Sequence, residues 1–393
     1  MVNVQTLKGF RDFLPSEVRK REYVLNTLKK VFALYGFEPL ETPSLEYEEI
    51  LTGKYGDEGD KLMYKFKDNG ERNVALRYDQ TVPLARVVAQ YQNDLPMPFK
   101  RYQVQNVWRA ENTQKGRYRE FIQCDVDTVG TAALSADAEM LSLIYNAYKK
   151  LGFDIQILIN DRSKLSAIEN KYLSSIDKVG KIEEEQILKE MEEKGMSLDE
   201  AKKVFNEVKN MPQPESITEV IKNFTSLGNP ADVIQYRSVL VRGLDYYTGL
   251  IYEVILKGQD KLFSLGGGGR YDNLIGMFAG RDIPAVGFAF GFDRVIETMD
   301  QLNLFPKQLF GTKVLVTNTN EEKTSEIANK LREKDINTEV YLDQKDLEKQ
   351  LKYADKKQIP YVLIFDGEKL VLKDMEKRTQ ENLTIEEIIK KLS

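Results

Sequence analysis

Residues 99–130, FKRYQVQNVWRAENTQKGRYREFIQCDVDTVG, decide the fold of this chain. They predict two β-strands joined by a polar, basic loop. The second strand, 121–129, alternates between two faces, because successive side chains of a strand point to opposite sides. Its apolar face holds Ile122, Cys124, Val126 and Thr128, and its polar face holds Gln123, Asp125 and Asp127.

The polar face of this strand lies next to a basic loop. The loop carries Lys115, Arg117 and Arg119, and the strand before it ends in Arg109. Acids and amides beside arginines indicate a pocket for a ligand that is both cationic and anionic, such as an amino acid beside a phosphate. The alternative is a solvated hairpin with surface salt bridges, which contribute little to stability.

Length and composition indicate a soluble protein of two or three domains. The chain has 393 residues, of which 41% are hydrophobic and 30% charged, as is ordinary for globular proteins. No apolar run approaches the roughly 18 residues that cross a bilayer, and the N-terminus lacks the apolar core of a signal peptide. Cys124 is the single cysteine, which excludes an intramolecular disulfide and a thiolate metal cluster. We therefore expect a cytoplasmic protein with no membrane partner.

Charge and histidine content restrict the chemistry. A net charge of −5 argues against indiscriminate coating of nucleic acid, although local basic patches could still bind RNA. The chain contains no histidine, so imidazole cannot serve as a base, a nucleophile or a metal ligand. The chemistry must use arginine, lysine, carboxylates, tyrosine and any bound metal. This set suits a reaction whose nucleophile is already ionised.

Four motifs resemble those of the histidyl-tRNA synthetase family, a branch of the class II aminoacyl-tRNA synthetases. VWRAE at 107–111, GRYREF at 116–121 and QCDVD at 123–127 together resemble motif 2. VRGLDYYTG at 241–249 is similar to a signature specific to this family, and GFAFGFDR at 287–294 resembles motif 3. GGGGRYDNLI at 266–275 also matches, whereas alone it would indicate a flexible turn that fits neither a P-loop nor a dinucleotide fingerprint.

The resemblance implies an α+β fold. It implies a class II synthetase antiparallel-sheet catalytic domain with a helical insertion, followed by a C-terminal α/β anticodon-binding domain. The expected boundaries are 1–159 and 236–305 for the two parts of the catalytic domain, 160–235 for the insertion and 311–393 for the C-terminal domain. We expect a strand carrying Arg77, Asp79 and Thr81 before a helix that begins at Pro83, and strands that resume at Val239. The charge pattern of the insertion indicates a solvated surface, and direct contact with tRNA is the alternative.

The resemblance also implies the reaction and its residues. Histidine would be activated by ATP with Mg²⁺, the adenylate would pass to tRNA-His, and the enzyme would be a homodimer. Arginines suit this reaction because they can stabilise negative charge that grows at phosphorus. The implied catalytic residues are Arg109, Arg242 and Arg294, and the implied ATP-binding residues are Arg109, Arg117 and Arg294. The implied histidine-binding residues are Asp79, Thr81, Gln123, Asp127, Tyr246, Tyr247 and Tyr271, and the implied tRNA-binding residues are Lys115, Arg119 and Lys356.

Two further details and two alternatives complete these expectations. No protein-held metal site is expected, and Tyr353 and Lys357 are further candidates for anticodon contact, unless they are plain surface residues. One alternative is the synthetase-like regulatory subunit of ATP phosphoribosyltransferase, a binding module in which such arginines are usually lost and the C-terminal domain is usually absent. The other is a sensor that binds tRNA without aminoacylating it.

Overall fold

The structure is a computed structural model that forms two compact units. It describes residues 4–54, 56–113, 117–242, 246–258, 263–306, 309, 311–319, 321–344, 346–366 and 369–393. The first unit comprises Met1–Leu14 and Arg21–Leu304, and the second comprises Pro15–Lys20 and Phe305–Ser393. The predicted insertion, 160–235, falls inside the first unit. The predicted boundaries around it stay predictions.

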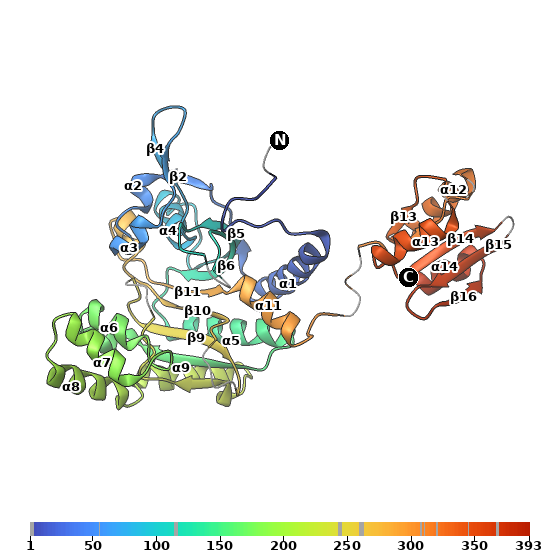
Figure 1. Ribbon diagram of the computed structural model, residues 1–393. Coiled ribbons are helices and arrows are strands. Elements are labelled where there is room, and N and C mark those ends of the chain that lie inside the picture. Colours follow the sequence, from blue (N-terminus) through green and yellow to red (C-terminus); the bar gives the residue numbers. More distant parts are fainter. Residues whose placement is uncertain are drawn as a thin grey trace. The chain divides into compact units, whose positions relative to one another are not determined.

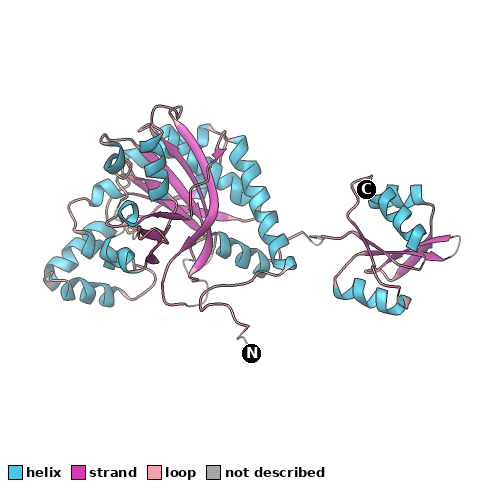
Figure 2. Cartoon of the chain, turned by 90° about the horizontal axis from the view of Figure 1, so that it is seen from above, coloured by secondary structure: helices cyan, strands magenta, loops and turns pink. Residues whose placement is uncertain are grey.

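An eight-stranded sheet forms the centre of the first unit, and helices lie around it (Figures 1 and 2). Six consecutive strands are antiparallel, while β1 and β8 pair in parallel at the two edges. In spatial order the strands are β1 (Glu38–Pro39), β5 (Phe99–Trp108), β6 (Glu120–Val129), β11 (Ala285–Phe290), β10 (Gly266–Arg270), β9 (Leu250–Leu256), β7 (Ile155–Asp161) and β8 (Ile234–Tyr236). The predicted hairpin corresponds to β5 and β6, which lie between β1 and β11 in this sheet.

One face of the sheet is apolar and packs against helices. Val126 of β6 pairs with Phe288 of β11, and the ring of Phe290 lies 5.5 Å from that of Phe32 and 5.4 Å from that of Tyr148, centroid to centroid. Phe32 comes from α1 (Pro15–Leu34) and Tyr148 from α5 (Leu134–Lys150). Burial of these large rings contributes to the hydrophobic stabilisation of the unit.

The opposite face is polar on β5 and β6 and nearly bare on β10 and β11. Asp127 of β6 lies opposite Arg101 of β5 on one side and Gly287 of β11 on the other. Gly287 in turn pairs with Gly269 of β10. Since cross-strand partners share a face, the carboxylates of β6 border a surface that the glycines leave clear of side chains.

The glycine run forms strand β10 instead of the flexible turn that it would indicate alone. Its backbone is closely packed on the apolar face of the sheet. A Cβ atom on Gly268 would overlap the carbonyl oxygen of Gly287 in β11, and one on Gly266 would lie 2.7 Å from the ring of Phe288. Close approach of neighbouring backbone and side chains therefore selects glycine here.

Four helices form the insertion, and the first three share a small core (Figure 1). They are α6 (Asn170–Ile176), α7 (Glu184–Glu193), α8 (Leu198–Lys209) and α9 (Glu215–Ser226). Helix α9 packs against α5 and also contacts β7. Asp177, which follows α6, accepts the backbone N–H of Arg242 at 3.1 Å and so ties the insertion to the predicted signature segment.

A smaller three-stranded sheet, in the order β2-β4-β3, extends the first unit near its N-terminus. The elements around it are β2 (Leu45–Tyr47), α2 (Glu48–Leu51), α3 (Gly56–Lys61), β3 (Lys65–Lys67), β4 (Asn73–Leu76) and α4 (Thr81–Gln90). The remaining elements are the 3₁₀ turns η1 (Arg162–Leu165) and η2 (Ala231–Val233), and the helices α10 (Gly276–Ala279) and α11 (Phe292–Gln301).

The second unit contains a five-stranded sheet in the order β13-β12-β14-β15-β16. Its strands are β12 (Val314–Val316), β13 (Thr338–Val340), β14 (Tyr361–Asp366), β15 (Lys369–Asp374) and β16 (Thr379–Asn382), and its helices are α12 (Glu321–Arg332), α13 (Leu347–Lys356) and α14 (Ile385–Leu392). A capping box between Thr384 and Glu387 starts α14, since each satisfies a backbone N–H of the other.

Three local predictions were wrong. Strand β4 ends at Leu76, and Asp79 lies in a turn where its Oδ1 accepts the backbone N–H groups of Thr81 and Val82, each at 3.1 Å. This carboxylate starts α4 at Thr81, so Pro83 is the third helical residue instead of the first. Strands do not resume at Val239, because Arg242 has a left-handed backbone (φ 61°) and β9 begins only at Leu250.

The packing of β10 predicts that Gly268→Ala destabilises the fold. The new methyl group must displace the backbone of β11, and we expect a loss of about 1–3 kcal/mol in the free energy of unfolding. Chemical denaturation would measure it. Gly70→Ala is the control, because a Cβ there meets only flexible side chains at 3.4 Å, in an exposed turn. Equal unfolding free energies for the two variants would contradict this account of β10.

Candidate active site

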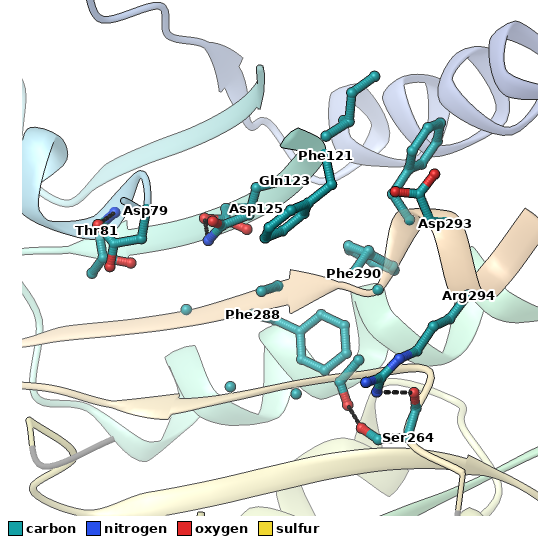
Figure 3. A pocket seen from close by; sticks show the side chains of 18 of the residues that line it. Asp79, Thr81, Phe121, Gln123, Asp125, Ser264, Phe288, Phe290, Asp293 and Arg294 are labelled. Atoms are coloured by element: carbon teal, nitrogen blue, oxygen red, sulfur yellow. Dashed lines mark hydrogen bonds between the residues drawn. The ribbon is translucent and has the colours of Figure 1, made fainter. Parts of the chain in front are cut away.

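A cavity of about 350 Å³ opens on the polar face of the large sheet. Figure 3 shows Asp79 and Thr81 at one end, Gln123 and Asp125 in the middle, and Arg294 at the other end. All the residues predicted to act on histidine or ATP line this cavity: Asp79, Thr81, Arg109, Arg117, Gln123, Asp127, Arg242, Tyr246, Tyr247, Tyr271 and Arg294. The sheet therefore brings together residues that are up to 215 positions apart in sequence (Asp79 to Arg294).

Two acids of β6 form the floor of one half of the cavity. Asp125 accepts a hydrogen bond from Gln123 Nε2 at 2.7 Å, and its Oδ1 has no hydrogen-bond partner among the described residues. Burial raises the pKa of Asp125 well above its usual value, against the lowering effect of Arg101, and the nearby acids Asp127 and Asp79 raise it further. A buried acceptor that lacks a donor is suited to a cationic ligand group.

Asp127 lies between a cation and a phenol. Its Oδ2 is 2.8 Å from Arg101 Nη2, and its Oδ1 accepts a hydrogen bond from the hydroxyl of Tyr271. Asp127 is 4% exposed and Arg101 0%. Burial raises the pKa of Asp127, while Arg101 and the Tyr271 hydroxyl lower it. The carboxylate is therefore held in one orientation at the floor of the cavity.

Three tyrosines surround this floor. The ring of Tyr246 lies 4.9 Å from that of Tyr247 and 5.9 Å from that of Tyr271, centroid to centroid. Burial raises the pKa of all three phenols, so each remains a protonated hydrogen-bond donor at neutral pH. Such donors can orient a polar aromatic ligand.

Arg242 reaches the cavity from a strained backbone. Its φ of 61° is unusual for a residue with a side chain, and strain of this kind persists where the surroundings enforce it. The backbone N–H of Arg242 donates to Asp177. The Arg242 guanidinium covers Gly267 so closely that a Cβ atom on Gly267 would overlap Nη1. Its guanidinium carbon lies 5.9 Å from the centroid of the Tyr247 ring.

The other half of the cavity contains the two remaining predicted catalytic arginines. Arg109 donates from Nε to the carbonyl oxygen of Tyr78 at 3.1 Å, and its guanidinium lies against the rings of Tyr78 and Phe121. Arg294, in the first turn of α11, donates from Nη1 to the carbonyl oxygen of Ser264 at 3.0 Å (Figure 3). Both guanidinium groups are thus positioned before any ligand binds.

The N-terminal segment contributes contacts that the sequence did not predict. Arg11 lies against the ring of Tyr118, a cavity residue, and 3.2 Å from the carboxylate of Asp293. Arg21 also contacts Asp293, at 2.6 Å. Arg11 therefore connects the loop after β5 to the start of α11, which carries Arg294, and Arg21 adds a second cation at that helix start.

The residues predicted to bind tRNA are not gathered in the cavity. Arg119 donates from Nε to the carbonyl oxygen of Glu111 at 3.1 Å, and Lys115 lies outside the described residues. Lys356 is exposed at the end of α13. Tyr353 and Lys357 both donate to the carboxylate of Glu339, each at 2.5 Å. For all these residues, contact with tRNA stays a prediction.

Sequence reasoning missed Arg101, Asp125, Glu111 and Tyr118 as members or neighbours of the site. Asp125 had a signal, because it shares the polar face of β6 with two residues that were predicted. The sequence held no such signal for Arg101, because one arginine in a strand does not indicate which residue of the neighbouring strand it faces. Its role depends on the register of β5 against β6.

The described residues do not form a metal-binding site of their own. Across the described ranges, no group of three or more cysteine, aspartate or glutamate residues could hold a metal ion. Mg²⁺ typically binds through substrate phosphates with one or two carboxylates, so the predicted Mg²⁺ would arrive with the triphosphate. Besides Asp79, Asp125 and Asp127, the carboxylate residues Glu111 and Asp293 line the cavity. Within the same ranges, none of the helices has the length and apolar character to cross a membrane.

Family models match nearly the whole length of the chain. A family model for histidyl-tRNA synthetase matches residues 9–163 and 160–295, and an anticodon-binding domain model matches residues 312–393. A histidine–tRNA ligase of Christiangramia forsetii is 38% identical over 438 aligned positions, covering 96% of each chain. A histidyl-tRNA synthetase structure from Nostoc sp. PCC 7120 has a TM-score of 0.84 and 30% identity over 100% of both chains.

A third protein is similar in fold alone. It is a Bacillus halodurans structure described as an ATP phosphoribosyltransferase regulatory subunit/histidyl-tRNA synthetase. It has a TM-score of 0.74 and 22% identity, and the match covers 92% of this chain and 98% of that one.

The contact between Gly267 and Arg242 predicts a variant that is folded but impaired. In Gly267→Ala the new methyl group meets the movable end of a side chain, so the unfolding midpoint should change little while the Arg242 guanidinium is displaced. We expect amino-acid-dependent ATP–pyrophosphate exchange to fall about 10²-fold, as for other small misplacements. Wild-type exchange with an unchanged midpoint would contradict this position of Arg242.

Proposed function

The chain belongs to the histidyl-tRNA synthetase family and joins histidine to tRNA, and we propose that the cavity on the large sheet is where it activates histidine with ATP. One observation carries the proposal. One cavity has buried acids and tyrosines in one half and arginines in the other. Glycines leave the floor between the two halves clear of side chains. A zwitterionic amino acid fits the first half, and a triphosphate fits the second. ATP–pyrophosphate exchange assayed with each amino acid in turn tests this assignment.

The reaction needs cations more than it needs a base. The carboxylate of histidine attacks the α-phosphorus of ATP, and pyrophosphate leaves. The nucleophile is already ionised, so the main demand is to stabilise negative charge that develops at phosphorus. We assign Arg109 to the α-phosphate, Arg294 to the γ-phosphate, and Arg242 to both the histidine carboxylate and the α-phosphate. Arg117 is assigned to ATP from the rim, where its side chain is 57% exposed.

The acid half would recognise the amino acid. We assign Asp79, Thr81 and Gln123 to the ammonium group, and Oδ1 of Asp125, which has no hydrogen-bond partner among the described residues, offers a further acceptor beside them. Asp127 and Tyr247 are assigned to the imidazole, with Tyr246 and Tyr271 completing the wall. A pocket that hydrogen-bonds a polar ring rejects apolar analogues strongly, because its buried groups are then left without partners.

The two alternative functions have less support. A regulatory subunit would not need three preorganised guanidinium groups, yet Arg109, Arg242 and Arg294 all line the cavity. The second unit, which matches the anticodon-binding model, is also present. A sensor that binds tRNA without aminoacylation would not require this intact pocket either.

Several finer features remain our proposals. We propose a cytoplasmic homodimer, and exposed apolar side chains on the small sheet, namely Leu45, Tyr47 and Phe66, support a subunit contact there. We propose that tRNA-His is contacted by Lys115 and Arg119, between β5 and β6 in the sequence, and by Lys356 in the second unit. Mg²⁺ is proposed to accompany ATP and offset the charge of its phosphates.

The role of Arg242 predicts that Arg242→Ala nearly abolishes adenylate formation. Loss of one preorganised donor to a developing charge lowers rates by about 10²–10³-fold, and exchange kinetics would measure it. Arg237→Ala is the matched control, because this arginine precedes the same segment and donates to the carbonyl oxygen of Val179, outside the cavity lining. Near-wild-type exchange by Arg242→Ala would remove Arg242 from the catalytic set.

The role of Asp127 predicts a selective defect in Asp127→Asn. The substitution replaces an acceptor with a mixed donor and acceptor, so the KM for histidine should rise about 10- to 100-fold while the KM for ATP stays nearly constant. Asp137→Asn is the control, because Asp137 is also buried beside an arginine, Arg270, but does not line the cavity. An equal rise in both KM values for Asp127→Asn would show that Asp127 does not read the ring.

A further inference from the structure

Arg101 is a buried cation beside the pocket, and the assignments above leave it without a role. It is 0% exposed and lies on β5 directly opposite Asp127 of β6. Its Nη2 is 2.8 Å from Asp127 Oδ2. Arg101 does not line the cavity, so any effect on a ligand must pass through Asp127.

Stability alone does not account for this arginine. A buried ion pair is often no more stabilising than an apolar pair of similar volume, because both charges lose their hydration. Among the described residues, Nε and Nη2 of Arg101 also find no acceptor with hydrogen-bond geometry, although Nη2 is in ionic contact with Asp127. A cation that is costly to bury indicates a function for the group that it faces.

A chain of buried side chains fixes Arg101 from behind. Its Nη1 donates to Gln103 Oε1 at 3.3 Å, and Gln103 Nε2 donates to Thr42 Oγ1 at 2.8 Å and to Gln105 Oε1 at 2.7 Å. Gln105 Oε1 also accepts from Arg77 Nη1 at 2.9 Å. Because each member is held by the next, the guanidinium cannot turn away from Asp127 when a ligand binds.

The charges around Asp127 make Arg101 decisive for its ionisation. The titratable groups that act electrostatically on Asp127 are Arg101 of β5, Asp125 of β6, Asp79 before α4 and Tyr271 after β10. Tyr252 of β9 also acts on it, although it lies on the opposite face of the sheet. Burial raises the pKa of Asp127, Arg101 lowers it, and Asp79 raises it. Without Arg101, burial and the neighbouring acids would keep this carboxyl protonated to higher pH.

We propose that Arg101 is a positioning residue that sets selectivity for histidine by fixing Asp127 as an ionised acceptor for the ring N–H. The inference rests on the proposed function, in which Asp127 reads the imidazole. A carboxylate has about four acceptor positions, and contacts with Arg101 and Tyr271 leave room for one more donor. The pair therefore extends the specificity site one layer behind the cavity wall.

The test compares histidine-dependent ATP–pyrophosphate exchange of Arg101→Met with that of the wild type, between about pH 6 and pH 9, on either side of the usual pKa of imidazole. At neutral pH the variant should lose about 10²-fold in kcat/KM for histidine, with the KM for ATP nearly unchanged. The ratio of variant to wild-type kcat/KM should then rise with pH, as the raised pKa of Asp127 is passed. Titration of the substrate ring cancels in this ratio. Arg101→Lys, which keeps the charge, should restore most of the selectivity and flatten the ratio.

Arg77→Met is the matched control. Arg77 is also buried in the same chain of side chains, but it donates to the carbonyl oxygens of Thr42 and Asn106 and makes no contact with Asp127. Its removal should lower the unfolding midpoint and leave the ratio independent of pH. Should Arg101→Met fail to fold, Arg101→Gln takes its place in the same comparison.

Two outcomes would overturn the inference, and they are distinguishable. A folded, charge-neutral variant at position 101 with a pH-independent ratio would show that Arg101 is merely structural. Histidine-independent exchange by the wild type would instead refute the proposed function, and the inference with it.

Discussion

The site depends on a constraint at the middle of the large sheet, where two neighbouring strands carry almost no side chains on one face. Gly267 and Gly269 of β10 and Gly287 of β11 leave a bare backbone surface beside the acids of β6. Larger residues would overlap Arg242 at one of these positions and Asp127 at another. A ligand can therefore lie flat on hydrogen-bonded backbone, which moves less than any loop would.

Around that surface the charges are arranged in an order that matches the proposed substrates. Buried acids occupy one half and guanidinium groups the other, and Arg242 stands over the glycines between them. Most of these groups are already held by neighbours: Arg109 by a carbonyl oxygen and two rings, Arg294 by a carbonyl oxygen, and Asp127 by Arg101 and Tyr271. Little reorganisation is then needed at the moment of reaction, which is the condition for electrostatic stabilisation.

The sequence predicted the central hairpin, and candidate residues that line one cavity, better than it predicted local geometry. The alternation of 121–129 and the charged loop before it were sufficient for the hairpin, because a period of two is a direct consequence of strand geometry. Family resemblance then identified residues far apart in the chain. It could not show that Asp79 would start α4 with its own carboxylate, or that Arg242 would have a positive φ. Arg101 was missed for a different reason, since its meaning lies in cross-strand register, which is a tertiary property.

The hydrogen bond from Arg242 N–H to Asp177 makes the helical insertion part of the thermodynamics of the site. Proteins open locally with free energies well below that of global unfolding, often one supersecondary unit at a time. Opening of α6 would release the left-handed backbone that aims the Arg242 guanidinium over the glycines. The population of the competent enzyme would then depend on the stability of a helix outside the cavity, and a molecule that binds the closed and open forms of α6 with different affinities would shift that population without contacting a substrate.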